Sequence, residues 1–368
     1  MKLSFQKSNL LNGINIVSKA VPSKTTMPIL ECILIDATEE EIKLTANDME
    51  LAIETKVEGS ILEKGKICID AKLFSEIIRK LPDSEVIIEE KDEKIAILCE
   101  KANFSISGRR GDDFAYMPSV ETDQYICLSQ FTLKETIRQT IFSIAVNENN
   151  KLMTGELFEI EGNQLKVVSL DGHRISIRNV ELKDSYEKKK VVVPGKTLIE
   201  ISRILPGDAD KDVYIFFSKN HILFEFDQTM VLSRLIEGEY FKIDQMISSD
   251  FETKITVNKK DILDSIERSV LLIRESDKKP IIMDIKEESM ELSLNSVIGS
   301  MKEDILIHKK GKDILIGFNP RFLIDALRVI DDEEITIYMV NSKAPCFIRD
   351  EENQYIYLIL PVNFNVSR

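Results

Sequence analysis

Apolar residues recur at helical spacing in a segment that occurs three times along the chain. The three copies are AKLFSEIIRKL (71–81), GKTLIEISRIL (195–205) and PRFLIDALRVI (320–330). In the first copy, the apolar positions i, i+3, i+4 and i+7 are Phe74, Ile77, Ile78 and Leu81. This spacing places the apolar side chains together, so each copy is predicted to be an amphipathic helix with one buried face. Pro82 and Pro206 follow two of the copies, where a helix is expected to end.

A second repeated segment has the alternating pattern of β-strands. Its copies are KLTANDMELAIETKV (43–57), KVVSLDGHRISIRNV (166–180) and ELSLNSVIGSMKEDI (291–305), at offsets of 123 and 125 residues. Each copy begins with apolar–polar alternation and has a polar turn near its middle, which predicts a β-hairpin.

The repeat extends over the whole chain of 368 residues, which is too long for one ordinary core. Each unit also begins with a further helical pattern, near residues 7–21, 130–146 and 258–274. We therefore predict an α+β fold of three tandem domains, each with two helices packed on antiparallel sheets. The predicted domain bounds are 1–123, 124–249 and 250–368.

Charge is distributed unevenly along the chain. The whole chain carries −14, yet the six helical segments carry +8 and the remainder −22. In the repeated helix, the basic residues seven positions apart are Lys72/Arg79, Lys196/Arg203 and Arg321/Arg328. Residues seven apart lie on one helix face, which predicts three equivalent basic stripes. The alternative is that each stripe is a solvated face, neutralised within its helix by the acid at i+4: Glu76, Glu200 or Asp325.

A basic surface repeated in this way suits binding to the phosphates of duplex DNA, without sequence preference and with freedom to slide. The chain has no zinc-finger spacing and no helix rich in Arg, Asn and Gln, so a base-reading device is not indicated. Trp is absent and aromatic residues make up only 7% of the chain, which argues against a platform that stacks single-stranded bases.

Two short motifs suggest catalysis. PGKT (194–197) is similar to the end of a phosphate-binding loop, but Lys190 stands where such a loop has its first glycine. Pro194 is better interpreted as an N-terminal helix residue. The second motif, DGHR (171–174), suggests a metal ligand or an acid–base pair.

The DGHR motif lacks the partners that such chemistry needs. The other two histidines, His221 and His308, have no ligand spacing to His173. A turn with exposed side chains is the better interpretation. We therefore predict no catalytic residue, no metal and no cofactor. The alternative left open is a metal- or nucleotide-dependent enzyme that uses Asp171 and His173.

Cysteine usage and hydropathy indicate a cytoplasmic protein without membrane contact. No apolar run approaches the roughly 20 residues that span a bilayer, and the start, MKLSFQKSNLL, lacks the apolar stretch of a secretion signal. The cysteines are odd in number and contain no C-x-x-C pair, which favours reduced, buried thiols. They are Cys32, Cys68, Cys99, Cys127 and Cys346.

Six motifs, in order and in register with the repeat, resemble the bacterial β sliding clamp, a family of replicative DNA polymerase subunits. They are TTMPIL (25–30), LTANDMEL (44–51), LDGHR (170–174), SRLIEGEY (233–240), FNPRFLIDAL (318–327) and LPVNF (360–364). The resemblance implies a head-to-tail homodimer whose six domains close into a ring around DNA. It also implies four kinds of partner: duplex DNA, a clamp loader, the replicative DNA polymerase, and other clamp-binding replication and repair proteins.

By the same resemblance, partner peptides dock in an apolar pocket between the second and third domains. The matching positions are Met153, Leu170, Gly172, His173, Arg174, Ile175, Phe241, Gln245, Met246, Pro345, Leu358, Leu360, Pro361, Val362, Asn363 and Phe364. His173 and Arg174 are expected to orient the peptide. The alternative for Leu358 and Leu360 is that they simply alternate into a terminal strand.

The sequence departs from the family pattern at the pocket rim. Phe241 stands where proline is usual, Lys343 where the residue is often apolar, and Asn363 where a basic residue is frequent. Residues 365–368 extend past the usual end. These differences concern the peptide preference of the pocket.

The remaining expectations concern the ring contact and DNA. Phe104 and Ile106 on a first-domain strand match one side of the ring contact, and Leu271 and Leu272 on a third-domain helix match the other. Ordinary core packing is the alternative for these four residues. The candidates for DNA contact are Lys24, Lys72, Arg79, Lys196, Arg203, Arg321 and Arg328. A third class, an ordinary DNA-binding regulator, would instead show sequence-dependent affinity.

Overall fold

The chain folds as an α+β protein in which the described strands pair antiparallel in four sheets. The structure is a computed structural model that describes residues 1–115, 118, 120, 124–146, 149–274 and 279–364. Residue contacts divide the chain into two compact units. The first comprises Met1–Leu133 and Ile199–Leu235, and the second Lys134–Leu198 and Ile236–Arg368. Residues 365–368, the predicted extension, lie outside the described residues.

The first unit contains a five-stranded and a nine-stranded sheet. The five-stranded sheet has the order β5 (Ser60–Glu63), β1 (Lys2–Gln6), β7 (Glu85–Lys91), β8 (Lys94–Cys99), β9 (Ala102–Ser107). The nine-stranded sheet has the order β10 (Arg109–Arg110), β6 (Gly65–Asp70), β2 (Cys32–Ala37), β3 (Ile42–Asn47), β4 (Leu51–Val57), β16 (Thr229–Arg234), β15 (His221–Phe226), β14 (Asp212–Phe217), β11 (Tyr125–Ser129).

The second unit contains a seven-stranded and a four-stranded sheet. The seven-stranded sheet has the order β12 (Gly155–Leu170), β13 (Arg174–Pro194), β25 (Tyr355–Ile359), β24 (Cys346–Arg349), β23 (Glu334–Met339), β17 (Thr253–Asn258), β21 (His308–Gly311). The four-stranded sheet has the order β20 (Ser300–Leu306), β19 (Ser289–Asn295), β18 (Ile281–Lys286), β22 (Ile314–Phe318). The predicted hairpins are confirmed as β3–β4, β12–β13 and β19–β20.

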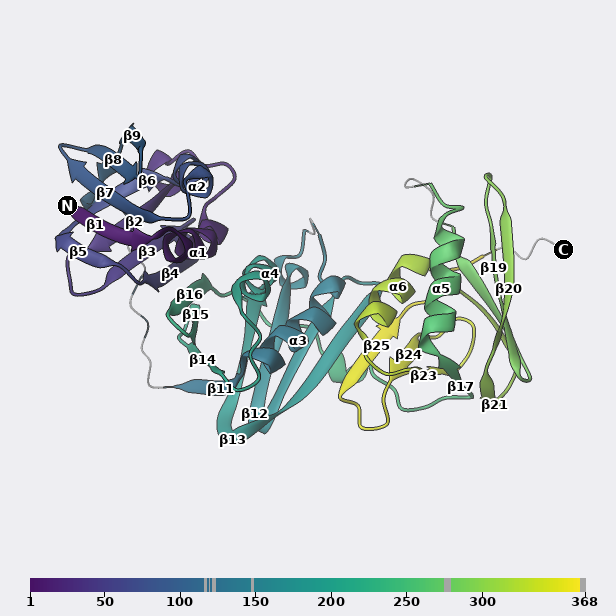
Figure 1. Ribbon diagram of the computed structural model, residues 1–368. Helices are drawn as coiled ribbons and strands as arrows, with labels where there is room; N and C mark the ends of the chain where they lie inside the picture. Colours follow the sequence, from purple (N-terminus) through teal and green to yellow (C-terminus); the bar gives the residue numbers. More distant parts are fainter. Residues whose placement is uncertain (116–117, 119, 121–123, 147–148, 275–278, 365–368) are drawn as a thin grey trace. The chain divides into compact units, whose positions relative to one another are not determined.

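The six predicted helices are confirmed, each ending slightly earlier than the pattern suggests (Figure 1). They are α1 (Lys7–Val17), α2 (Ala71–Lys80), α3 (Gln130–Thr140), α4 (Gly195–Ile204), α5 (Lys259–Val270) and α6 (Pro320–Val329). The short 3₁₀ turns are η1 (Ser18–Ala20), η2 (Pro28–Glu31), η3 (Gly111–Asp113), η4 (Ile141–Ser143), η5 (Lys151–Thr154) and η6 (Ile243–Gln245). No described helix has the length and apolar character needed to cross a membrane.

Local capping explains where the repeated helix begins. In α2, the Asp70 carboxylate accepts a hydrogen bond from the Leu73 amide (2.7 Å), and in α6 the Asn319 side chain accepts from the Arg321 amide (3.1 Å). Such caps satisfy amides that have no partner within the helix. The prediction for Pro194 was wrong, because it ends β13 and α4 begins at Gly195.

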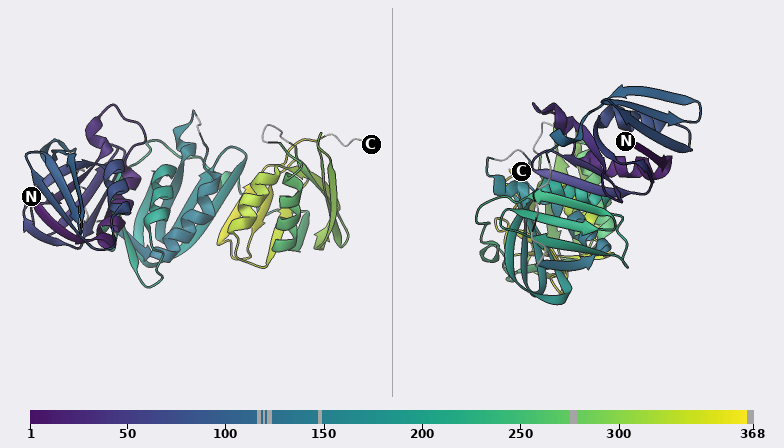
Figure 2. Two further views of the ribbon diagram at one scale, coloured as in Figure 1. Left: turned by 45° about the horizontal axis from the view of Figure 1, so that its top comes forward. Right: turned by 90° about the vertical axis from the view of Figure 1, so that its left-hand side faces the viewer.

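The buried faces of the helices agree with the apolar pattern. Phe74, Ile77, Ile78 and Leu81 are all buried. Helix α5 packs beside α6, as the left view of Figure 2 shows. Cys32, Cys68, Cys99 and Cys346 are buried thiols, as predicted, whereas Cys127 is half-buried.

Two sheets continue from one repeat into the next. In the first unit, five residue pairs join β4 to β16, with Thr55 opposite Thr229. In the second unit, five residue pairs join β13 to β25, with Arg174 opposite Ile359. Main-chain hydrogen bonds therefore hold each join between repeats.

Glu156 is an unusual core residue. Its side chain is fully buried, and within the described part of the chain neither carboxyl oxygen has a hydrogen-bond partner. The nearby Thr140 hydroxyl donates to the Thr136 carbonyl instead (2.7 Å). Burial raises the pKa of Glu156 from 4.5 to about 8, so the neutral acid is the form that the core accommodates.

We expect Glu156 to make stability depend on pH. The pKa of Glu156 is higher in the folded state than in the unfolded state. Its contribution to the stability of the folded state is therefore complete below pH 4.5 and is lost as pH rises through about 8. As pH rises from 4.5 to about 8, the free energy of unfolding should therefore decrease in the native protein and decrease less in the variant Glu156→Gln. Urea unfolding of both proteins across this range measures the difference, and a difference independent of pH would contradict the expectation.

Candidate functional site

Three of the predicted pocket residues form a row across adjacent strands of the seven-stranded sheet. Leu170 on β12 lies opposite Ile175 on β13, and Ile175 lies opposite Leu358 on β25. All three side chains are buried in one apolar cluster, against which Met153 and Phe241 pack. Directly opposite residues in a sheet project to the same face, so the strand register itself assembles this apolar floor.

Leu358 shows how β25 serves two clusters. Its side chain joins the apolar floor, whereas the neighbouring Tyr357 and Ile359 face the core of the third repeat. The alternation expected for a terminal strand is therefore correct for Leu358. Leu360 lies beyond the strand and is 36% exposed, so strand alternation does not account for it.

A tight turn connects the two strands that carry the floor. The Asp171 carboxylate accepts hydrogen bonds from the amides of His173 (3.0 Å) and Arg174 (3.1 Å). Gly172 has a φ of +83°, a conformation that favours glycine. The predicted turn is confirmed, but the prediction of exposed side chains was wrong for Asp171 and Arg174, whose side chains are mostly buried.

Arg174 links this turn to the third repeat. Its guanidinium donates to the carboxylates of Asp171 (3.0 Å) and Asp325 (2.6 Å) and to the Phe142 carbonyl (2.6 Å). Its Cζ lies 4.4 Å from the centre of the Phe322 ring. Because these contacts engage all three guanidinium nitrogens, the side chain holds the turn against α6.

The segment after β25 completes the rim of the pocket. The Leu360 amide donates to the His173 carbonyl (2.9 Å), and the Val362 amide donates to the Gly317 carbonyl (2.8 Å). Phe364 lies over Gly317, where an added Cβ would come within 2.6 Å of its ring. Backbone bonds thus hold the segment while the Leu360 and Val362 side chains remain exposed.

The other predicted pocket residues lie around this floor and rim. Met153 is in η5, and Gln245 ends η6, next to the exposed Met246. Phe241 is half-buried, with its ring centre 5.5 Å from that of Tyr240. The remaining partly or fully exposed positions are Gly172, His173, Pro345, Pro361 and Asn363.

The geometry does not favour chemistry at Asp171 and His173. The Asp171 carboxylate is engaged by the turn and by Arg174, and the His173 ring stacks on Phe322 at 6.1 Å between centres. Within the described residues, no group of three or more His, Cys, Asp or Glu side chains is arranged to hold a metal ion.

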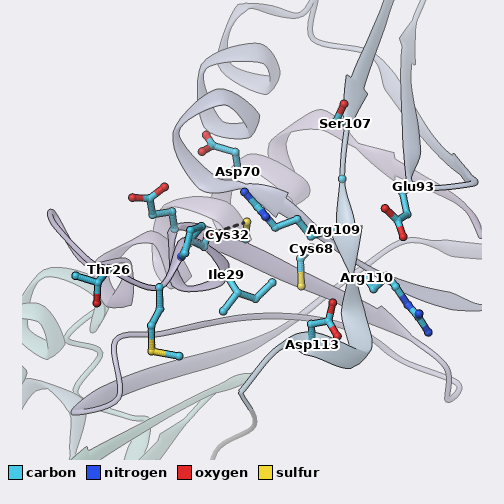
Figure 3. A pocket seen from close by; sticks show the side chains of 14 residues that line it. Thr26, Ile29, Cys32, Cys68, Asp70, Glu93, Ser107, Arg109, Arg110 and Asp113 are labelled. Carbon is cyan, nitrogen blue, oxygen red and sulfur yellow. Dashed lines mark hydrogen bonds between the residues drawn. The ribbon is translucent and has the colours of Figure 1, made fainter.

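A cavity of about 800 Å³ in the first unit contains two thiols (Figure 3). Burial raises the pKa of the Cys68 thiol to about 12 and also raises that of Cys32. Arg109 extends towards Cys32 from the edge strand β10. A thiol acts as a nucleophile or metal ligand only as the thiolate, and burial disfavours that form at both cysteines.

The seven predicted DNA-binding residues are all exposed. Lys72 and Arg321 have no polar side-chain partner among the residues that the structure describes. Arg203 pairs with Glu200 (2.6 Å), and Arg79 donates to the Ser75 hydroxyl (3.2 Å). Lys24 and Lys196 are exposed as well.

In the third copy of the repeated helix, the acid at i+4 does not neutralise the basic stripe. Asp325 binds Arg174 instead of Arg321, and Arg328 pairs with Glu267 on α5 (2.8 Å). Surface pairs of this kind contribute only about 0–1 kcal/mol. In the second copy, by contrast, Glu200 does pair with a basic residue of its own helix, Arg203.

Two of the four predicted ring-contact residues lie at the open edge of a sheet, and the other two follow helix α5. Phe104 and Ile106 are on β9, which ends the five-stranded sheet, opposite the buried Ile97 and Ile95. Leu271 follows α5 and is 79% exposed, whereas Leu272 packs partly against the core.

One feature at these edges was missed from the sequence. Strand β20 ends the four-stranded sheet, and its last residue, Leu306, is 85% exposed. Val297 and Ile298, in the β19–β20 turn, are exposed too. Two apolar residues in a hairpin turn were the signal that could have identified this surface.

Comparison with known proteins agrees with the geometry. Models of the N-terminal, central and C-terminal domains of the DNA polymerase III beta subunit match residues 1–118, 127–242 and 244–363. The beta sliding clamps of Staphylococcus epidermidis and Bacillus subtilis are 33% and 34% identical, each match covering 98% of this chain and 99% of the relative.

Solved structures show the same fold. A putative DNA polymerase III beta subunit from Eubacterium rectale is 68% identical, with a TM-score of 0.97 and full coverage of both chains. The Bacillus subtilis DNA polymerase sliding clamp is 33% identical, with a TM-score of 0.96, covering 99% of this chain and 100% of that one. The chain belongs to the DNA polymerase III beta subunit family, the beta sliding clamps.

Proposed function

We propose that the protein is a processivity factor for DNA replication: a ring that encircles duplex DNA, slides along it and tethers the replicative polymerase. The observation that carries this proposal is the threefold repeat, in which each copy keeps an exposed basic stripe on a chain that is acidic elsewhere. Phosphate contacts position a protein on DNA without reading sequence, so such a ring can slide.

The proposed ring is a head-to-tail homodimer of three-domain protomers, with domains at 1–123, 124–249 and 250–368. Two different open edges support it: β9 with Phe104 and Ile106, and β20, which follows Gly299 beside Leu272. Leu271, the residue before Leu272, is exposed. A contact between unlike patches must close into a ring or grow into a filament. An open strand edge is also a ready template for strand pairing.

The proposed pocket comprises the floor of Leu170, Ile175 and Leu358 with its rim of Met246, Leu360 and Val362. Flexible methionine and aliphatic side chains suit a site that several peptides share. We propose that the polymerase, a clamp loader and other clamp-binding proteins dock here. The chain itself is proposed to catalyse nothing, since a separate loading machine would supply the hydrolysis, and to act on DNA in the cytoplasm.

The decisive experiment is topological. After loading onto circular DNA, the protein should stay bound at high salt, because enclosure does not depend on phosphate contacts, and should run off once the circle is cut. Gel filtration of the protein with intact and linearised plasmid measures retention. Equal retention on both forms would rule out encirclement, and metal-dependent turnover lost in His173→Ala would favour the enzyme alternative.

A further inference from the structure

A single row of residues crosses all seven strands of the larger sheet in the second unit. Each member lies directly opposite the next, so the whole row projects from one face of the sheet. Beyond the three floor residues of the proposed pocket, the row continues with Phe347, Tyr338, Lys254 and Lys310. Phe347 and Tyr338 belong to the same apolar cluster as the floor. The row therefore begins in the pocket and ends in two lysines.

Arg349 widens the basic end of this row. It lies two residues after Phe347 on β24, so it projects from the same face of the sheet. Its Cζ lies 4.6 Å from the centre of the Tyr338 ring, and the Lys254 Nζ lies 5.4 Å from that centre. One aromatic ring thus attracts two cationic groups. We call Lys254, Lys310 and Arg349 the cationic patch.

The charges of the cationic patch are not neutralised by neighbouring acids. Among the described residues, none of the three has a carboxylate partner, and the Arg349 guanidinium donates to the Ser249 carbonyl (3.4 Å). Glu252, two residues before Lys254, pairs with Lys312 instead (2.7 Å). Three cations without counter-ions, on a chain of net charge −14, form a local positive field that suits an anionic partner.

The side chains of the patch are oriented before any partner binds. Lys254 and Arg349 are half-buried, and both rest against Tyr338. The exposed Phe251 packs edge-on against the same ring, at 5.3 Å between centres. Side chains that are already held in place lose less entropy when a ligand orders them.

The spacing of the strands sets the length of a ligand that contacts both the floor and the patch. Lys254 on β17 lies three strands from Leu358 on β25, as the strand order in Figure 1 shows. Three strand spacings amount to about 14 Å. An extended chain of about four or five residues covers that distance.

The apolar start of the row favours a peptide over DNA as the occupant. Duplex DNA is also an anion, but its phosphate backbone has no apolar side chain to place on Leu170, Ile175 and Leu358. A peptide with an apolar anchor and an acidic flank complements both ends of the row.

We propose that the cationic patch is a second docking surface, which binds an acidic segment of the partner peptide whose apolar anchor occupies the floor. This inference rests on the proposed function and deepens it, because it states a charge preference for the residues that flank the anchor.

Fluorescence anisotropy with labelled peptides and the full-length protein tests the proposal. The peptides share one apolar anchor and differ in a flank of glutamates or glutamines, about six residues long, before or after the anchor. At low salt, the glutamate flank should raise affinity about tenfold over the glutamine flank, as three exposed ion pairs would. The gain should appear with the flank at one end only, because the patch lies to one side of the floor, and should disappear at high salt.

Lys254→Gln with Lys310→Gln should reduce this gain from about tenfold to about twofold, because one cation of the three remains. Affinity for the glutamine-flanked peptides should not change, which also shows that the pocket stays folded. Lys91→Gln with Lys219→Gln is the matched control. It removes two exposed lysines of the first unit and should preserve the whole gain.

The remaining outcomes separate the possible failures. Equal affinities for glutamate and glutamine flanks in the native protein would overturn the cationic patch and leave the pocket intact. If the native protein binds none of the peptides, the pocket and the patch both fall. If the Lys254 and Lys310 double variant loses affinity for a short duplex and keeps the peptide gain, the patch contacts DNA and the proposal is wrong.

Discussion

Phe104→Arg is expected to convert a dimer of 84.2 kDa, twice the chain mass of 42.1 kDa, into monomers. Phe104 is 38% exposed at the open edge of β9 and lies opposite the fully buried Ile97. A guanidinium without a partner in an apolar contact costs about 3–5 kcal/mol. A closed two-subunit ring contains this contact twice, so the cost would apply twice. Sedimentation velocity at micromolar concentration measures the mass.

Ser105→Arg provides the control for this prediction. Ser105 is the next residue on β9 and, by strand alternation, projects to the other face of the sheet. It adds the same charge to the same edge, and the dimer should persist. A dimer that survives Phe104→Arg would exclude this edge from the ring contact.

The second large effect is expected at the pocket rim, where Leu360→Asp should weaken binding of a polymerase-derived tether peptide about 30-fold or more. The Leu360 side chain is exposed, while its backbone is held by the His173 carbonyl, so a carboxylate alters the pocket without altering the fold. Removal of a side chain that acts as a hot spot of an interface costs about 2 kcal/mol or more, and we expect Leu360 to be one. Fluorescence anisotropy with the labelled peptide measures the affinity.

Substitution is a sharper test here than truncation. Deletion of residues 360–368 would also remove the Val362 bond to Gly317 and uncover the surface under Phe364. Leu62→Asp, at an exposed leucine of the first repeat, controls for the added charge and should leave peptide affinity unchanged. The dimer should remain intact in both variants. Undiminished peptide binding by Leu360→Asp would remove the pocket assignment.

Local pattern predicted the helices and hairpins well, for a physical reason. The apolar positions of α2, from Phe74 to Leu81, predict burial directly, because residues spaced at the helical period lie on the one face that packs on the core. The turn at Gly172 was equally predictable from the sequence, because few residues other than glycine adopt its positive φ.

Partners far apart in the sequence could not be predicted in this way. Asp325 has the spacing of an internal partner for Arg321, yet it binds Arg174, 151 residues away. The pairing of β13 with β25 likewise depends on tertiary contact, because the apolar pattern of a strand does not show which strand lies beside it. The exposed edge at β20 was missed for the same reason. Its exposure follows from the order of strands in the sheet, which the apolar pattern of one strand does not reveal.

The join between β13 and β25 has a consequence for synthesis of the chain. Arg174 pairs with Ile359, which the ribosome adds 185 residues later. At about 5–20 residues per second, the nascent β13 waits roughly 10–40 s for its neighbour. During that interval its hydrogen-bonding edge is exposed to other nascent chains, so translation speed and chaperone access should govern the yield of correctly folded protein.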